Sequence, residues 1–427
     1  MKRSKLKRLS LKQELRYLKA KNEEILSILD QKIFSSKTYK MWQFYNKIKR
    51  RILFIVGPII LSVMYIILAP LYLLCIFLIF VVSFTLAQFT PKKAMLKLQK
   101  KDLEIDGISF IIPTWNKGSL LVKCLQQLDS IASQEVPSIK KEIIVIDNGS
   151  SDDTLKLLSK LKLSIPLIVI PLEKNLSFAP AINIGVKRSS YNYVYLLNND
   201  MFVQKKFLTE LCTFAQPIIE KGTIFYGIAS QIFFFKHVPR RIESGKTYYT
   251  PYVGSLYIAH CILDDSLQDP SITGYVGGGS SLIQKHVFEY LHYYDESLFR
   301  PLYVEDVDTS FRAWRMGFPS YFLPSSTAIH HHQSSSKKLK KTPEYYIQKN
   351  VILLLLKNIT SLRSLLLHAV IFPLNIFLAP STSRIILDTL KSSIDIVRSR
   401  TNMLSFPYKQ SESEIIDFPR FEKEYEI

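Results

Sequence analysis

The sequence predicts an α/β domain with a mostly parallel sheet and helices on both faces. An N-terminal transmembrane helical hairpin precedes it and C-terminal helices follow it. A long uncharged stretch, then short apolar runs alternating with amphipathic stretches, and then a return of apolar helical patterns support this prediction. We divide the chain into a basic segment, a membrane segment, an α/β domain and a C-terminal extension with a tail: residues 1–51, 52–90, 105–345 and 346–427.

The composition fits a membrane-attached protein of a reducing compartment. Its 427 residues carry a net charge of +20, and 47% of them are hydrophobic. Such a charge suggests an anionic membrane face, a polyanion or a phosphorylated substrate. The four cysteines are scattered without a CxxC pair, which argues against a zinc site or a disulfide framework. Much of the charge flanks the apolar segment and no DNA or RNA motif occurs, so we expect no nucleic-acid partner.

Residues 1–51 are rich in Lys and Arg, with apolar residues at roughly helical spacing. This pattern indicates either a solvated helix or a helix lying on anionic lipid, and the sequence leaves both open. It does not indicate a signal peptide, because the basic region is far longer than a normal n-region.

Residues 52–89 contain no charged side chain. As one helix they would be about 57 Å long, against a hydrocarbon core of about 30 Å. Pro70 lies near the middle, and basic residues flank both ends, which favours two short spans that enter and leave by the cytosolic face. One tilted span with an interfacial extension is the alternative.

The α/β domain begins with apolar runs that alternate with amphipathic stretches. Four runs predict strands: Ile108–Ile112, Glu142–Ile146, Leu167–Ile170 and Tyr193–Leu197. Helices are expected between them at Ser119–Ser133, Thr154–Leu161 and Ala179–Lys187. Ligands of parallel sheets bind at the carboxyl ends of the strands, and the polar clusters of this chain fall there. After residue 345 we expect helices docked on the domain or lying in the membrane interface, and after Ser405 a loosely ordered tail.

Two strand ends carry candidate binding residues. Asp147 and Asn148 follow an apolar run and can hydrogen-bond a base or ribose, although Asp-Asn-Gly-Ser is also ordinary turn chemistry. Asp200 closes the run Leu197-Asn198-Asn199-Asp200, where a carboxylate can hold Mg²⁺ or Mn²⁺, and an ordinary turn is again the simpler interpretation.

Three further motifs occur later in the domain. Glu305, Asp306 and Asp308 precede an amphipathic helix; clustered acids raise one another's pKa, which suits a general base, although acids also simply favour a helix start. The run His330–His332 can supply a metal ligand, or it can be an exposed loop. Gly277, Gly278 and Gly279 can allow close approach of a donor or acceptor sugar, or form an ordinary tight loop.

Taken together, the order and spacing of these motifs from Ile108 to Asn358 resemble the family-2 glycosyltransferases of GT-A fold, in particular their rhamnosyltransferase-like branch. The segments that carry the resemblance are Ile111–Asn116, Val145–Ser150, Glu173–Gly185, Leu196–Asp200, Glu305–Asp308, Leu323–His330 and Tyr345–Asn358.

The resemblance implies an inverting transfer of one sugar from a nucleotide sugar, UDP- or dTDP-linked, to a glycan or lipid-linked acceptor. Asp306 would be the base with Glu305 beside it, and Asp200 and His330 would hold Mg²⁺ or Mn²⁺. The donor would contact Pro113, Thr114, Asn116, Asp147, Asn148, Asn175, Asn183, Asn198 and Asn199, and the sugar loop would be Gly277–Gly279.

The location implied is the inner or plasma membrane, with membrane lipids as partners, a cytosolic domain and a role in cell-envelope polysaccharide biosynthesis. Ser177 and Pro180 stand where the family usually has glycines, and the Gln-x-x-Arg-Trp signature of processive synthases is missing. A degenerate fold that binds nucleotide sugars without turnover is the competing function.

Overall fold

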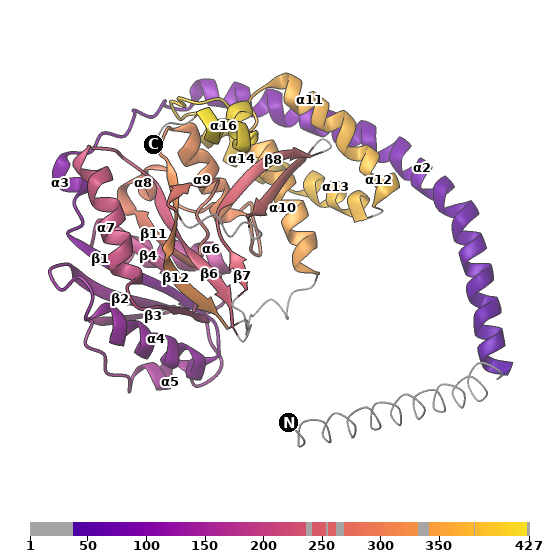
Figure 1. The fold of residues 1–427 in the computed structure, drawn as a ribbon. Helices are drawn as coiled ribbons and strands as arrows, with labels where there is room; N and C mark the ends of the chain where they lie inside the picture. The colour runs from indigo at the N-terminus through magenta and orange to yellow at the C-terminus, as the bar shows by residue number, and fades with distance from the viewer. Residues whose placement is uncertain are drawn as a thin grey trace, which may run out of the picture. The chain divides into compact units, whose positions relative to one another are not determined.

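The computed structural model describes residues 37–235, 241–252, 255–261, 269–331, 341–379 and 381–424, and Figure 1 shows its ribbon. Most of the predicted basic segment and His332 lie outside the described residues. The described chain forms two compact units. The smaller comprises residues 37–67 and 376–379, and the larger comprises residues 68–375 and 381–424.

The predicted hairpin is wrong, because the apolar segment forms one continuous helix, α2 (Lys37–Phe89), that passes Pro70 without a break. Proline is tolerated inside such apolar helices when neighbouring groups satisfy the freed carbonyl. Within α2, Gly57–Phe89 is long and apolar enough to cross a membrane, by length and composition. Its 33 residues correspond to about 50 Å, longer than the hydrocarbon core.

The first half of the domain follows the prediction closely. Strands β1 (Gly107–Thr114), β2 (Lys140–Asp147), β3 (Leu167–Pro171) and β4 (Tyr193–Leu197) are parallel in the order β4-β1-β2-β3. Between them lie α4 (Gly118–Ala132), α5 (Thr154–Leu158) and α6 (Phe178–Arg188). The apolar residues of β1, β2 and β4 are almost continuous and buried, as expected for strands covered on both faces.

The second half is mixed rather than parallel. Strands β6 (Gly227–Phe234), β11 (Ser280–Gln284) and β12 (Ser320–His330) extend the sheet, and β11 is antiparallel to both β4 and β6. β12 runs parallel to β6 and pairs with the short strands β5 (Met201–Val203) and β10 (Ser271–Ile272), and β7 (Ile242–Ser244) pairs with β6. A separate hairpin is formed by β8 (Thr247–Tyr252) and β9 (Ser255–His260).

Helices cover both faces of the sheet, as predicted. Helix α6 packs so closely on one face that a Cβ at Gly185 would lie 2.6 Å from Ile111 and Ile146 side chains. On the other face, Phe110 and Tyr195 contact Phe207 of α7 (Phe207–Glu220). Strand residues that alternate in direction supply both packed layers. Short helices α3 (Lys100–Leu103) and α8 (Lys285–Tyr290) and the helix α9 (Glu305–Arg315) complete the domain.

The C-terminal residues form helices that belong to the larger unit, except that residues 376–378 belong to the smaller one. They are α10 (Pro343–Asn358), α11 (Leu362–Ile371), a 3-10 turn (Phe372–Leu374), α13 (Ser381–Lys391), α14 (Ser393–Met403), α15 (Glu412–Ile416) and α16 (Phe418–Glu424); α12 (Asn375–Leu378) follows the turn. The expected loose tail is wrong: Phe418 is buried against Tyr249 and Trp314, and Glu412 accepts hydrogen bonds from Thr360 and Ser361. Aromatic residues outweigh the polar composition of this segment.

Candidate functional site

The carboxyl ends of β1 and β2 place two predicted binding residues side by side. Thr114 pairs with Asp147 in the parallel register, and both are buried. The Ser150 N–H donates to Asp147 Oδ1 at 3.1 Å, which fixes the carboxylate at the start of the following turn. Pro113, one residue earlier on β1, pairs with Ile146. This edge of the sheet therefore offers a carboxylate and a hydroxyl to one ligand.

Asparagine side chains join the loops that follow these strands. Asn116 accepts from the Ser151 N–H at 2.8 Å, and its own N–H donates to Ser150 Oγ at 2.7 Å. Asn148 accepts from the Leu176 N–H at 2.8 Å and donates to the Ser177 carbonyl at 2.9 Å. These bonds hold the loops after β1, β2 and β3 in one fixed arrangement.

Asn175 belongs to the same arrangement. Its Oδ1 accepts from the Ser177 N–H at 2.8 Å and lies 3.4 Å from Asn148 Nδ2. Ser177, where a glycine was expected, has a φ of 81°. That left-handed value favours glycine, so the loop keeps a glycine-like shape at some conformational cost.

The Asn198-Asn199 pair connects the first half of the site to the second. Asn199 Nδ2 donates to Thr114 Oγ1 at 2.8 Å, and the Asn198 N–H donates to the Gly279 carbonyl at 3.0 Å. The amide of Asn198 crowds Gly279, because a Cβ there would lie 3.1 Å from its Nδ2. The glycine loop thus approaches the end of β4, as a glycine without a side chain allows.

Asp200 and His330 lie together at the edge formed by β5 and β12. His330 Nε2 is 3.3 Å from Asp200 Oδ1, and His330 Nδ1 is 2.7 Å from Glu243 Oε1. Burial alone would lower the pKa of His330, but hydrogen bonds to Asp200 and Glu243 raise it to about 9. Asp200 has a lowered pKa: burial opposes the shift, and the bond to His330 outweighs it.

Asp200 and His330 match the chemistry of two metal ligands. Neighbouring donors on an octahedral ion with bonds of 2.0–2.1 Å lie about 3 Å apart, close to the observed separation. Glu243 binds the second ring nitrogen, as carboxylates commonly do for metal-bound histidines. Among the described residues no group of three or more His, Cys, Asp or Glu side chains is arranged to hold a metal. Diphosphate oxygens and water would have to complete the shell.

Asp306 lies on the far side of the glycine loop, in the first turn of α9. Its Oδ2 accepts from the Gly278 N–H at 3.1 Å, and its Oδ1 accepts from the Val307 N–H at 2.8 Å. Burial raises the pKa of Asp306, and these backbone donors partly offset the rise. A Cβ at Gly277 would approach Asp306 Oδ2 no closer than 3.9 Å, so the loop leaves space beside the carboxylate.

Glu305 differs from its neighbour. Its side chain is buried, and its Oε2 has no hydrogen-bond partner among the described residues. Burial and the adjacent Asp306 raise the pKa of Glu305 well above its ordinary value. Backbone donors favour the charged form of Asp306, whereas the buried Glu305 Oε2 has no such donor among the described residues.

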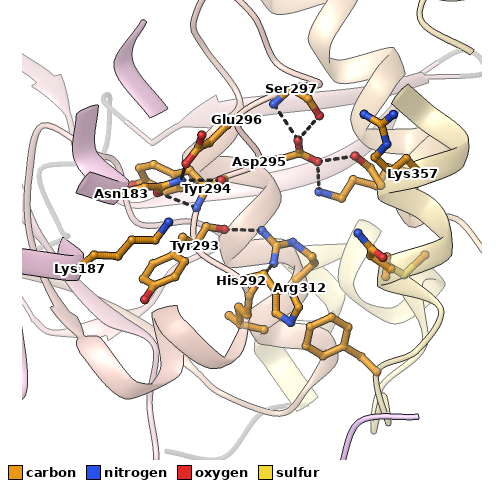
Figure 2. Close-up of a pocket in the computed structure, with 16 residues that line it drawn as sticks. Asn183, Lys187, His292, Tyr293, Tyr294, Asp295, Glu296, Ser297, Arg312 and Lys357 are labelled. Atoms are coloured by element: carbon orange, nitrogen blue, oxygen red, sulfur yellow. Dashed lines mark hydrogen bonds and ion pairs between the residues drawn. The ribbon is translucent and has the colours of Figure 1, made fainter. Parts of the chain in front are cut away.

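Asn183 is not gathered with the other predicted binding residues. Its amide donates to the Tyr294 carbonyl and to Glu296 Oε1, both at 2.9 Å, and accepts from the Tyr294 N–H at 3.1 Å. Figure 2 shows it at a separate cavity of about 270 Å³, lined also by Lys187, His292 and Arg312. Asn183 therefore fixes the loop at residues 294–296.

Several site residues escaped the sequence analysis. Glu243 stands alone in its segment, and nothing nearby in the sequence connects it to His330. Phe178 packs on the glycine loop, since a Cβ at Gly278 would lie 3.1 Å from its ring. Tyr294 stacks on Phe178 with centroids 6.4 Å apart. These contacts join residues 87 to 116 positions apart, and no short motif encodes them.

Part of the domain is similar to known proteins. Residues 109–262 match the family described as "Glycosyl transferase family 2". The poly-beta-1,6-N-acetyl-D-glucosamine synthase of Staphylococcus aureus is 34% identical over 102 residues, 24% of each chain. The Staphylococcus epidermidis enzyme of that name is 33% identical over 113 residues, 26% of each chain. The match therefore spans about a quarter of the length of these curated relatives.

Two solved structures also align with the chain. GalNAc-T7 with UDP, GalNAc and Mn²⁺ gives a TM-score of 0.48 at 18% identity, covering 62% of this chain and 52% of that one. S. aureus TarS 1-349 in complex with UDP-GlcNAc gives 0.45 at 14% identity, covering 74% of this chain and 92% of that one.

Proposed function

Because residues 109–262 form a family 2 glycosyltransferase domain, we propose that the protein transfers one sugar from a nucleoside-diphosphate sugar to a hydroxyl, with inversion. The acceptor is a glycan or a lipid-linked molecule. One continuous set of contacts supports this proposal: Asp147 beside Thr114, Thr114 to Asn199, and Asn198 through the glycine loop to Asp306. A candidate nucleotide site and a candidate base thus adjoin the same loop.

The proposed step is a single displacement. Asp306 takes the proton of the acceptor hydroxyl as its oxygen attacks the anomeric carbon, and the bond from that carbon to the diphosphate oxygen breaks. The nucleoside diphosphate leaves with the bonding electrons from the opposite face, which inverts the centre. A carboxylate of raised pKa is a better base than an ordinary aspartate at neutral pH.

Glu305 assists this step by remaining protonated. With its pKa raised well above normal, it stays neutral beside Asp306 and adds no second negative charge to the site. Asp306 consequently remains the ionised member of the pair and is available to accept the acceptor proton.

The donor is held at the ends of β1, β2 and β4. Asp147 and Asn148 bind base and ribose together with Pro113, Thr114, Asn116 and Asn175, and Asn198 and Asn199 contact the part nearer the phosphates. Asp200 and His330 are the residues that would hold Mg²⁺ or Mn²⁺. Such an ion would neutralise charge on the leaving diphosphate.

We place the reaction at the cytosolic face of an inner or plasma membrane, to which α2 attaches the domain. The apolar stretch Gly57–Phe89 supports attachment. The relatives' names point to cell-envelope polysaccharides and make UDP-N-acetylglucosamine the first donor to test. The nucleobase of the donor is expected to be uracil or thymine.

The test uses full-length protein and a panel of UDP- and dTDP-sugars with Mg²⁺ or Mn²⁺. Thermal shift identifies the donor, since ligand at a hundred times its Kd stabilises by about 2.7 kcal/mol. Release of nucleoside diphosphate and sugar transfer are then measured for that donor. Turnover that falls in Asp306→Asn, with donor binding retained, supports the proposal. Donor binding without any turnover would instead identify a degenerate nucleotide-sugar-binding protein.

A further inference from the structure

The second half of α2, Leu68–Phe89, has two different faces. One face is buried in the larger unit, at intervals of three or four residues: Leu68, Tyr72, Ile76, Ile79, Ser83 and Ala87. The opposite face is apolar and 37–84% exposed: Leu71, Leu73, Leu74, Phe77, Leu78, Val81, Val82, Phe84, Leu86 and Phe89. A buried stripe with an apolar outer face is not the pattern of a surface helix in water, whose outer face is polar.

Helix α11 lies beside this half of α2 (Figure 1) and extends its exposed face. Tyr72 Oη is 2.8 Å from His368 Nε2, and the Tyr72 ring centroid is 5.9 Å from that of Phe372. The outward side chains of α11 and its 3-10 turn are 41–57% exposed: Leu362, Leu366, Leu367, Val370 and Leu374. We call the exposed side chains of Leu68–Phe89 and of Leu362–Leu374 the apolar platform.

The buried side of the platform contacts charged protein interior. The guanidinium carbon of Arg400 on α14 is 5.5 Å from the Phe80 ring centroid. Arg400 is buried and donates to the carbonyls of Leu356 and Lys357 at the end of α10, at 2.9 and 3.3 Å. If Leu68–Phe89 crossed the hydrocarbon core, Arg400 on α14 and the end of α10 would lie inside that core as well. Placing a charged side chain there costs free energy.

We propose that the apolar platform lies flat in the membrane interface, with Leu68–Phe89 parallel to the bilayer surface and its exposed face in the acyl chains. The inference rests on the proposed membrane attachment and adds its geometry. In this geometry Leu68–Phe89 does not cross the hydrocarbon core. It also agrees with the length of Gly57–Phe89, which at about 50 Å is too long for one span along the membrane normal.

A lipid surface fits the platform better than a protein partner. Its outward side chains are mostly Leu, Val or Phe, and the exposed polar side chains among them are Thr85, Gln88 and Arg363. Protein interfaces, by contrast, carry a polar rim and about one hydrogen bond per 100–200 Å². Basic residues follow soon after Phe89: Lys92, Lys97, Lys100 and Lys101 are exposed. Lysines next to an apolar face are suited to anionic headgroups.

Tryptophan depth measurements on the full chain in phosphatidylethanolamine–phosphatidylglycerol vesicles test this geometry. Leu71→Trp, Leu78→Trp and Phe89→Trp put probes along one side of α2, and the outer two are about 27 Å apart. Leu367→Trp reports on α11. Quenching is compared between lipids with a nitroxide near the headgroup and lipids with one near the chain end. The unmodified chain gives the background of its own tryptophans.

The proposal expects all four probes to be quenched more strongly by the shallow nitroxide, in a similar ratio. It is overturned if Leu78→Trp is quenched mainly by the deep nitroxide while Leu71→Trp and Phe89→Trp are shallow, because that is the pattern of a crossing helix. It is also overturned if vesicle-bound protein shields the probes from both nitroxides and from aqueous iodide, as a second copy or protein partner would. Failure to sediment with vesicles would remove the membrane attachment itself.

Discussion

Two aspartates two residues apart on α9 have opposite surroundings. Asp306 is partly exposed, and its carboxylate accepts from the N–H groups of Gly278 and Val307 at 3.1 and 2.8 Å. Asp308 is fully buried and bonds Arg312, Lys357 and Asn358 at 2.8–2.9 Å. The Asp306 carboxylate can accept further hydrogen bonds beside the glycine loop. The Asp308 carboxylate is already bonded to two cations and an amide. Clustered acids in a sequence therefore need not share a role.

Asp308 belongs to a network that joins the α/β domain to the C-terminal helices. Lys357 on α10 bonds both Asp308 and Asp295 at 2.9 Å, and Ser399 on α14 donates to Asp295 at 2.6 Å. The cations and bonds around Asp295 lower its pKa despite its burial. Figure 2 shows Asp295 and Lys357 of this network at the edge of the cavity. Its charges are paired, which is typical of a structural role.

The largest expected effect is on activity at Asp306. Asp306→Asn removes the proposed base while keeping the side-chain shape, so kcat should fall about 10²–10⁴-fold. Chemical unfolding should show little loss of stability, and donor binding by thermal shift should persist. An unchanged kcat would show that Asp306 is not the base and would end the contrast with Asp308.

Asp308→Asn should act on stability instead. Removing one charge leaves the buried Arg312 and Lys357 without a shared anion, at a cost of about 3 kcal/mol in the free energy of unfolding. Urea denaturation measures it. The folded fraction should retain a kcat much closer to the parent than Asp306→Asn does. A stable but inactive Asp308→Asn protein would contradict the structural role.

Glu305→Gln sharpens the comparison by pH. The raised pKa means that folded Glu305 keeps a proton that the unfolded chain releases. The contribution of Glu305 to the free energy of unfolding is therefore complete below the ordinary glutamate pKa of about 4.3. It declines as the pH rises toward the pKa of Glu305 in the folded protein. Glu305→Gln cannot ionise, so its stability should decline less between pH 4.5 and 7. Unfolding curves at several pH values, with Glu296→Gln as an exposed control, measure the difference.

Glu243 is a third carboxylate for this comparison, and metal binding tests its role. Glu243→Gln keeps a hydrogen bond to His330 but removes the charge behind it, and loss of such a partner weakens metal affinity by about 10–100-fold. Titration with Mn²⁺ by thermal shift or electron paramagnetic resonance measures this directly. An equal affinity in both proteins would show that Glu243 does not orient a metal ligand.

The smallest effect concerns strain on the nucleotide side. Ser177 has φ 81° and ψ −179°, a region occupied almost only by glycine. Ser177→Gly should raise the free energy of unfolding by about 1 kcal/mol, because relieved strain exceeds the added flexibility of the unfolded chain. Ala181→Gly on the same helix should instead destabilise. A loss of stability in Ser177→Gly would mean that the loop is not strained.

The sequence predicted the parallel half of the fold because each of those strands has a recognisable pattern in its own local sequence. Ile143–Ile146 is a continuous β-branched run ending in Asp147, and the structure places it in β2. β11 and β12 lack such runs; Ser280 and Ser281 are buried by neighbours rather than by their own hydrophobicity. The hairpin prediction failed because it took Pro70 as the turn between two spans. A helix with protein contacts can continue through a proline.

The site was predictable to the same extent. Asp147, Asn148, Asp200 and Asp306 stand at strand or helix ends, where local pattern locates them. Asn183 was grouped with the donor site by its motif, yet its hydrogen bonds go to the loop at residues 294–296. Glu243 and Phe178 depend on tertiary contacts alone. Local order locates residues at a strand tip, and packing decides which of them turn toward a shared ligand.

The helix that carries Asp306, α9, is covered on its outer side by residues near the C-terminal end of the described chain. Phe418 and Phe421 of α16 pack against Trp314 of α9 with centroids 5.7 and 5.2 Å apart. A nascent polypeptide on the ribosome therefore exposes the Trp314 indole until residues about a hundred positions later have emerged. During translation α9, which carries Asp306, is therefore incompletely enclosed until α16 has left the exit tunnel.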